Sequence, residues 1–121
     1  QITYNLLDRE VEQRILPLAQ ERRVAVIVNR PFREGRLLET LRRHRLPGWA
    51  AEIDCDSWAQ VALKFVVSHP AVTCAIPGGK RASQVTDNVS AADLPALTDA
   101  QMAAVQTVYE QHAKPWVHQA W

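Results

Sequence analysis

The chain of 121 residues is long enough to bury one hydrophobic core, and its 47% hydrophobic and 22% charged residues are typical of folded globular proteins. This composition excludes an intrinsically disordered chain. The formal net charge of +1 creates no field that would attract nucleic acid or an anionic membrane, and the apolar runs are far shorter than the roughly 20 residues of a membrane span. We expect one domain without nucleic-acid or membrane partners.

The cysteines and histidines show no pattern of a disulfide framework or a metal site. Cys55 and Cys74 lack motif spacing, and none of the four histidines has a cysteine or carboxylate partner at metal-ligand spacing. We expect reduced thiols, no metal and a cytoplasmic location, while any export signal would precede Gln1. The chain starts in a strand-like run without an initiator Met, which predicts a fragment of a longer protein.

Taken in order, the chain alternates between strand-like and helix-like segments. Segments rich in β-branched residues predict strands at residues 2–5, 24–28 and 72–76. Apolar spacing predicts helices at residues 10–22 (with a kink or restart at Pro17), 36–44, 49–53, 58–67, 82–90 and from 99 onward. Residues 24–28 are continuously apolar, so we expect this strand to be covered on both faces. The alternation predicts an α/β fold with a parallel sheet.

Two capping boxes mark helix starts. Ser57 precedes a helical stripe and Gln60 follows three residues later, and Thr98 and Gln101 repeat the same spacing. Ser57 is therefore better explained as a helix cap than as a nucleophile, since no Gly-x-Ser-x-Gly motif surrounds it.

The segment after the third strand has the parts of a phosphate site. Pro77, Gly78 and Gly79 are followed by the adjacent cations Lys80 and Arg81 and then by a helix start. The spacing is neither that of a P-loop nor that of a Gly-x-Gly-x-x-Gly turn. On composition alone, the alternative is an ordinary strand-to-helix turn with two solvated cations. The basic run at residues 36–45 has a similar alternative, a solvated helix face rather than a nucleic-acid or phosphate contact.

Four motifs, in order and in register, resemble the aldo/keto reductase family. They are residues 4–9 (YNLLDR), 29–37 (NRPFREGRL), 57–60 (SWAQ) and 76–78 (IPG), the last followed ten residues on by Asn88. The resemblance implies NADP-dependent oxidoreductases of aldehydes and ketones with a (β/α)8 TIM barrel fold, which needs about 250 residues. It implies that residues 1–121 are a partial barrel, namely the last three βα units (strands 6–8) with C-terminal helices, and that residues 106–121 are a C-terminal tail.

The resemblance also implies a cofactor site. Gln1 matches a polar residue that contacts the nicotinamide carboxamide, and Asn29 matches a position where many members carry an aromatic side chain that stacks on the nicotinamide. The loop along the cofactor pyrophosphate is matched by Arg30, Pro31, Phe32 and Gly35. The loop at the adenosine 2′-phosphate is matched by Pro77, Gly78, Gly79, Lys80 and Arg81, with Gln84 and Asn88 reaching the phosphate or the adenine.

No residue of this chain matches the catalytic Asp, Tyr, Lys and His of the family. The resemblance therefore implies an NADP-binding half of an oxidoreductase, whose partners are a missing N-terminal half-barrel and a small carbonyl substrate, and no catalysis by this chain alone. The alternative is a non-catalytic half-barrel that self-associates because three strands leave unpaired edges.

Overall fold

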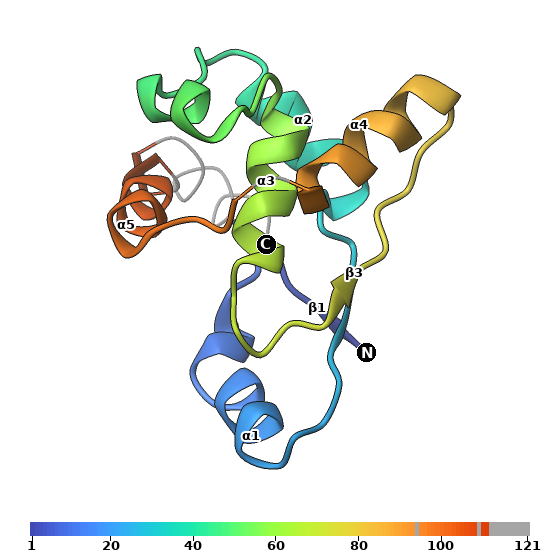
Figure 1. Cartoon of the computed structure of the whole chain (residues 1–121), viewed down its shortest axis with the longest axis vertical. Helices are drawn as coiled ribbons and strands as arrows, with labels where there is room; N and C mark the ends of the chain where they lie inside the picture. The colour runs from blue at the N-terminus through green and yellow to red at the C-terminus, as the bar shows by residue number, and fades with distance from the viewer. Residues whose placement is uncertain (94, 109, 112–121) are drawn as a thin grey trace.

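The computed structural model describes residues 1–93, 95–108 and 110–111 (Figure 1). Its sheet consists of three parallel strands in the order β1-β2-β3. They are β1 (Ile2–Thr3), β2 (Ile27–Asn29) and β3 (Cys74–Ala75), which confirms the predicted α/β arrangement with a parallel sheet. Each strand is shorter than expected. After β1 the side chain of Asn5 accepts the backbone N–H groups of Leu7 and Asp8 and turns the chain, and after β3 Pro77 has no N–H to donate.

Helical segments connect and cover the strands. In chain order they are η1 (Glu10–Glu12), α1 (Ile15–Glu21), η2 (Arg33–Gly35), α2 (Arg36–Leu41), η3 (Gly48–Ile53), α3 (Trp58–Val67), α4 (Ala82–Asp93) and α5 (Asp99–Val108). The helix expected at residues 10–22 restarts at Ile15, which puts Pro17 in the first turn, where its missing N–H leaves no bond unmade. Of the expected tail at residues 106–121, positions 106–108 belong to α5, and residues 109 and 112–121 lie outside the described residues.

Both predicted capping boxes form, although in the first one Gln60 bonds to the residue before the N-cap. Ser57 Oγ accepts the Gln60 N–H at 3.1 Å, and Gln60 Oε1 accepts the Asp56 N–H at 2.7 Å. Thr98 Oγ1 accepts the Gln101 N–H at 3.3 Å, while Gln101 Oε1 accepts the Thr98 N–H at 2.9 Å. These local bonds fix the starts of α3 and α5.

The helices cover one face of the sheet, and the expectation that β2 is covered on both faces is wrong. Ile2, Val28 and Ala75 are register partners and belong to the core or pack against it. On the opposite face, which we call the open face, Ile27 is 41% exposed and its partner Cys74 is also exposed. The continuous apolar run of residues 24–28 therefore reflects two apolar faces of which only one is buried by the described chain.

The core lies between the sheet and α3. Tyr4 and Phe65 are fully buried, with ring centroids 5.5 Å apart, and the Arg9 guanidinium lies 5.0 Å from the Phe65 ring centroid. The Tyr4 hydroxyl donates to Glu12 Oε1 at 2.7 Å, so burial together with this carboxylate raises the Tyr4 pKa. Among the described residues, the helices are all too short or too polar to cross a membrane.

Candidate functional site

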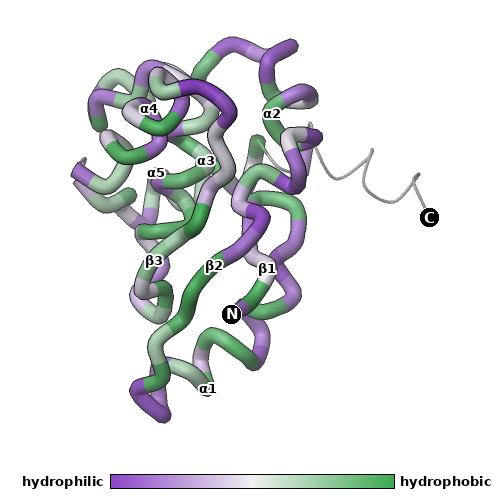
Figure 2. The backbone as a smooth tube through the Cα atoms, turned by 90° about the vertical axis from the view of Figure 1, so that its right-hand side faces the viewer, coloured by the Kyte–Doolittle hydropathy of each residue, from purple (hydrophilic) through white to green (hydrophobic). Residues whose placement is uncertain are grey.

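The two loops singled out by the sequence leave the sheet at the same edge. Because the strands are parallel, the carboxyl ends of β2 and β3 point in one direction. Figure 2 shows the three strands side by side. The loop after β2 leads into α2, and the turn after β3 leads into α4. In parallel α/β folds, ligands bind beyond this edge, so we call it the carboxyl edge.

The loop after β2 has a strained backbone. Arg30, Arg33 and Glu34 have φ values of 49°, 47° and 58°, in the left-handed region, and Gly35 follows with φ of 92°. Only the glycine adopts this conformation without a steric cost, so surrounding contacts must hold the other three residues. The predicted pyrophosphate loop therefore has a defined shape.

Asn5 anchors this loop from the neighbouring strand. Its side chain is fully buried, and Nδ2 donates to the Arg30 carbonyl at 3.0 Å and to the Asp8 carboxylate at 2.9 Å. Its Oδ1 accepts the N–H groups of Leu7 and Asp8. The Arg33 guanidinium lies 3.7 Å from the Asp8 carboxylate. Of the four hydrogen bonds of this buried amide, the one to the Arg30 carbonyl joins the loop after β2 to the loop after β1, and the other three order the loop after β1.

Asn29 and Gln1 lie on the open face of the sheet and are not part of the strained loop. Asn29 ends β2 on the open face, where its Oδ1 accepts the Thr3 hydroxyl at 2.8 Å. Gln1 is exposed and precedes β1, so it lies at the amino end of that strand and not beyond its carboxyl end. Strand alternation gives Gln1 and Thr3 the same face. By this alternation Gln1 belongs to the open face, two residues before Thr3, which is the register partner of Asn29.

The turn after β3 is exposed and already capped from within. The four residues that precede α4 are all exposed: Gly78, Gly79, Lys80 and Arg81. Gln84 Oε1 accepts the backbone N–H groups of Lys80 (2.9 Å) and Arg81 (3.2 Å). A side chain at position 79 would lie 3.1 Å from the Val85 side chain, so glycine fits this close approach. An anion at this helix start would compete with the Gln84 carbonyl for the two N–H groups.

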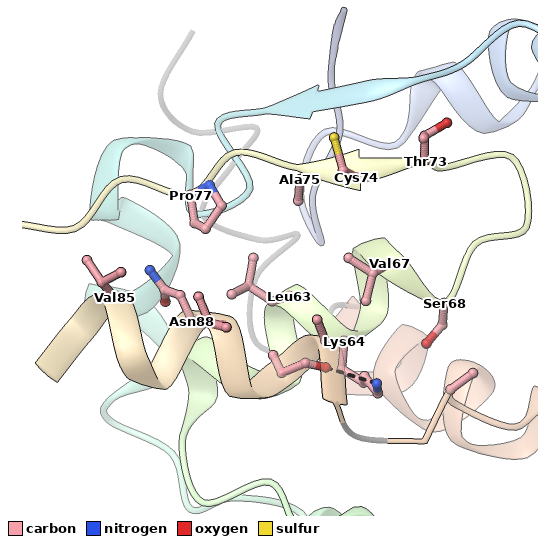
Figure 3. A pocket seen from close by; sticks show the side chains of 14 residues that line it. Leu63, Lys64, Val67, Ser68, Thr73, Cys74, Ala75, Pro77, Val85 and Asn88 are labelled. Atoms are coloured by element: carbon pink, nitrogen blue, oxygen red, sulfur yellow. Dashed lines mark hydrogen bonds between the residues drawn. The ribbon is translucent and has the colours of Figure 1, made fainter. Parts of the chain in front are cut away.

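A cavity of about 590 Å³ lies beside this turn, between β3, α3 and α4 (Figure 3). Of the predicted site residues it includes only Pro77, on the strand side, and Asn88, on α4. The rest of its lining is mostly apolar and includes Leu63, Val67, Ala75, Val85, Val89 and Ala92. The other predicted contacts of the phosphate lie on an open surface outside this cavity; they are Gly78, Gly79, Lys80, Arg81 and Gln84.

Lys64 is the buried cation of the cavity wall. Its side chain is almost fully buried, and Nζ donates to the Ala91 carbonyl in the last turn of α4 at 2.9 Å. Burial lowers the pKa of Lys64, while the Cys55 thiol and the Asp93 carboxylate act in the opposite direction. Burial likewise raises the pKa of Cys55. Because Lys64 Nζ satisfies a helix-end carbonyl, its contact there is structural.

The cysteines and acidic residues form no further centre among the described residues. Both cysteines are free thiols, with Cys55 buried and Cys74 exposed on the open face. No group of three His, Cys, Asp or Glu side chains within the described ranges could hold a metal ion.

Sequence reasoning missed two polar residues beside the predicted site. Asn5 holds the loop after β2, and Asp87 on α4 bonds to Ser57 and Gln60 at the start of α3. Asn5 is part of the motif at residues 4–9, but the resemblance assigned no role to it. Asp87 stands between Gln84 and Asn88, but its partners are 27 and 30 residues away, so local spacing carries no signal for them.

A family model described as "Aldo/keto reductase family" matches residues 1–110 of the chain. The chain belongs to the aldo/keto reductase family. It is 30% identical over 110 residues to methylglyoxal reductase YeaE of Escherichia coli (strain K12), which covers 90% of this chain and 38% of that relative. The chain thus spans well under half the length of this curated relative.

Solved aldo-keto reductases share the fold. The Klebsiella pneumoniae enzyme in complex with NADPH is 28% identical with a TM-score of 0.72, covering 90% of this chain and 38% of that one. The holo form of an aldo-keto reductase from Bacillus halodurans is 27% identical with a TM-score of 0.67, covering 92% and 44%. The match to the aldo/keto reductase family includes both carboxyl-edge loops and the whole of α4.

Proposed function

We propose that this chain forms the NADP-binding part of an aldo/keto reductase that transfers hydride between NADPH and an aldehyde or ketone. The observation that carries the proposal is the carboxyl edge, beyond which a strained, anchored loop and a cationic helix start both lie in a member of this family. The NADPH complex of the Klebsiella pneumoniae relative supports the choice of cofactor.

The residues present suit a nucleotide with a phosphate on its ribose. Lys80 and Arg81 offer two exposed cations, and their N–H groups open a helix of 12 residues, where the helix dipole favours an anion. When bound, NADPH supplies the hydride. The chain's part is to hold the 2′-phosphate at residues 77–81, the pyrophosphate along residues 30–35 and the nicotinamide near Asn29 and Gln1.

Titration of the chain with NADPH and NADH, followed by tryptophan fluorescence, tests this assignment. We expect tighter binding of NADPH, and we expect Lys80→Ala with Arg81→Ala to weaken NADPH binding about tenfold or more while leaving NADH binding unchanged, because charge-assisted bonds to the phosphate are lost. Arg22→Ala with Arg23→Ala is the matched control, since these adjacent exposed cations precede β2 at the other end of the sheet. Equal binding of the two cofactors by the folded chain would refute the phosphate assignment.

We further propose that residues 1–121 correspond to the last three βα units of the barrel, with residues 106–121 as its C-terminal tail, in a cytoplasmic protein. The share of about two fifths of the relatives' length supports this. Because no residue matches the catalytic Asp, Tyr, Lys and His of the family, the chain alone should not oxidise NADPH with methylglyoxal or another aldehyde. A longer chain that includes the missing half-barrel should do so. Turnover by the 121 residues alone would contradict this proposal.

The open face supports a second candidate, a self-associating half-barrel without catalysis. Ile27 and Ile76 on this face are 41% and 51% exposed, and β1 and β3 each have a partner on one side only among the described strands. A second copy or the missing half of the barrel would cover the same surface. The oligomeric state of the isolated chain distinguishes a half-barrel that covers this face by self-association from one that requires the further strands of a longer chain.

A further inference from the structure

Asp87 joins α4 to the amino end of α3 through both oxygens of its carboxylate. Oδ2 accepts the Ser57 hydroxyl at 3.0 Å, and Oδ1 accepts Gln60 Nε2 at 2.7 Å. Gln60 Nε2 also donates to Ser90 Oγ at 3.1 Å, and that hydroxyl donates to the Asp87 carbonyl at 2.8 Å. The junction therefore combines side chains from two helices into one closed network.

The two side chains that donate to the Asp87 carboxylate are those of the α3 capping box. Ser57 Oγ and Gln60 Oε1 accept backbone N–H groups at the helix start, so the capping box fixes both side chains before they reach α4. Asp87 then receives the hydrogens that the box does not use. A carboxylate at this helix start is also favoured by the α3 dipole. Gln60 is only 7% exposed, whereas Ser57, Asp87 and Ser90 are half-buried, so the junction is partly shielded from solvent.

The α3 side of the junction is built into the core. Most of α3 is buried, including Trp58 at its first turn, whose Nε1 donates to the His44 carbonyl at 2.9 Å. A bond to α3 therefore gives α4 a fixed reference in the core. Lys64 provides a second attachment at the other end of α4, through the Ala91 carbonyl. The junction at Asp87 is the one nearer to the cofactor turn.

The position of Asp87 in α4 connects this junction to the proposed cofactor site. Gln84 lies one turn before Asp87 and contacts the N–H groups of Lys80 and Arg81, and Asn88 follows Asp87 directly. We propose that Asp87 is a positioning residue, which fixes the rotation of α4 so that Gln84 and Asn88 face the 2′-phosphate and adenine of the nucleotide. This inference rests on the proposed cofactor function.

An exchange of the two functional groups tests the inference. Asp87→Asn replaces one of the two acceptor oxygens with an NH2 donor and removes the charge, so one of the bonds from Ser57 and Gln60 is lost and the other is no longer charge-assisted. We expect NADPH binding to weaken about tenfold, the scale of one lost charge-assisted bond. Adding Gln60→Glu restores a carboxylate–amide pair with its direction reversed, and the carboxylate introduced on α3 can still accept the Asp56 N–H. We expect this double variant to regain NADPH affinity to within about twofold of the original chain, because either direction makes the same bond.

Two outcomes would overturn the inference. If the double variant stays as weak as Asp87→Asn, the carboxylate of Asp87 acts on the nucleotide directly. If Asp87→Asn binds NADPH as well as the original chain, the junction does not position the site. Thr86→Ala is the matched control on α4, since the exposed Thr86 hydroxyl bonds only to the Ala82 carbonyl of its own helix.

A separate measurement keeps the inference testable if the original chain binds no NADPH, a result that would refute the proposed function. Amide hydrogen exchange of residues 82–88 reports the docking of α4 without any ligand. We expect faster exchange in Asp87→Asn and recovery in the double variant. Unchanged exchange in Asp87→Asn would refute the positioning role on its own.

Discussion

At the scale of single residues, the side chains of Gln84 and His69 each accept hydrogen bonds from backbone N–H groups. These bonds determine how the turn at Gln84 responds to a ligand and how His69 responds to pH. Gln84 accepts two N–H groups where the phosphate is proposed to bind. His69 Nδ1 accepts the Ala71 N–H at 3.2 Å and its ring meets Tyr4 edge-on, with centroids 5.9 Å apart. Nδ1 can accept this hydrogen bond only in the neutral imidazole, so protonation of His69 breaks the bond to Ala71.

Gln84→Glu should weaken NADPH binding while leaving the fold intact. A glutamate keeps the acceptor for the Lys80 and Arg81 N–H groups but adds a negative charge beside the proposed 2′-phosphate. We expect NADPH affinity to fall by about five- to tenfold, with less effect at high salt, and NADH affinity to change less. Gln101→Glu at the same position of the α5 capping box is the control. Equal NADPH affinity in both variants would place the phosphate elsewhere.

His69 should make the chain less stable in mild acid. Burial lowers the His69 pKa below the usual 6.5, with a smaller opposing effect of Glu12 and a smaller supporting effect of Arg9. The unfolded chain therefore binds the proton more readily, so this contribution to stability is complete above about pH 6.5 and is lost as the pH falls towards the folded-state pKa.

Urea unfolding of the chain and of His69→Asn, from about pH 5 to about pH 8, measures this effect. Asparagine keeps an acceptor for the Ala71 N–H but does not titrate. We expect the free energy of unfolding to fall more steeply in acid for the original chain than for the variant. Parallel pH profiles would show that another group is responsible.

At the scale of elements, the loop between β2 and α2 has a strained backbone, and substitutions in this loop can relieve or increase the strain. Glu34 holds φ of 58° against its preference, and its ion pair with Arg30 is 3.5 Å long and largely exposed. Such a pair contributes little, so it does not account for the conformation. Asn5 and Gly35 are the better explanation, the first by anchoring the loop and the second by accepting φ of 92°.

Opposite changes in stability should follow from substitutions in this loop. Glu34→Gly removes the steric cost of the left-handed backbone and should stabilise the chain by about 0.5–1 kcal/mol, despite the lost ion pair. Gly35→Ala should destabilise the chain by about 1 kcal/mol, since alanine disfavours the left-handed backbone at this position. The cost comes from the backbone alone, because a Cβ there meets no atom within 4 Å. Thermal and urea unfolding measure both. A stabilising Gly35→Ala would contradict the assigned backbone.

At the scale of the whole molecule, the sheet has one covered face and one open face. The open face combines the hydrophobic side chains of Ile27 and Ile76 with the polar pair Thr3 and Asn29. A barrel would enclose this face, whereas the chain alone exposes it to water. The same residues should therefore behave differently in the two contexts.

The double substitution Ile27→Lys and Ile76→Lys replaces two exposed apolar side chains of the open face with charged ones. It should therefore reduce self-association of the isolated chain without lowering its free energy of unfolding. Size-exclusion chromatography with light scattering measures the mass against 13.6 kDa for one copy. Leu18→Lys on α1, where Leu18 is 42% exposed, is the control. An original chain that elutes as a stable monomer would argue against association through this face.

Local features of this fold could be predicted from the sequence, whereas contacts across the sequence could not. The capping boxes at Ser57 and Thr98 depend on residues three positions apart, so spacing alone identified them. The Asp87 junction depends on how α4 lies against α3, which no local pattern encodes. The exposed face of residues 24–28 was missed for a related reason, since an apolar run shows that a face suits burial but not which segment covers it.

The candidate site divides in the same way. The order of strand, glycine turn and cations left two interpretations of residues 77–81, a phosphate site or an ordinary turn with solvated cations, and the phosphate site stays a prediction. The parallel sheet brings the loop of residues 30–35 to the same edge. The Gln84 cap and the position of Gln1 before β1 depend on local backbone geometry that composition does not determine. The cofactor itself was predictable only through the resemblance to a family.

The parallel order β1-β2-β3 also has a consequence in time. The Thr3–Asn29 bond joins residues 26 positions apart, and the bond from the Val26 N–H to the Thr73 hydroxyl joins residues 47 apart. Each pairing must close a loop before it gains a contact, so the helices can form early but the sheet comes late. During synthesis, β2 has no partner on its β3 side until residue 75 has left the ribosome. The apolar residues of β2 therefore stay exposed to water while more than forty further residues are added to the chain.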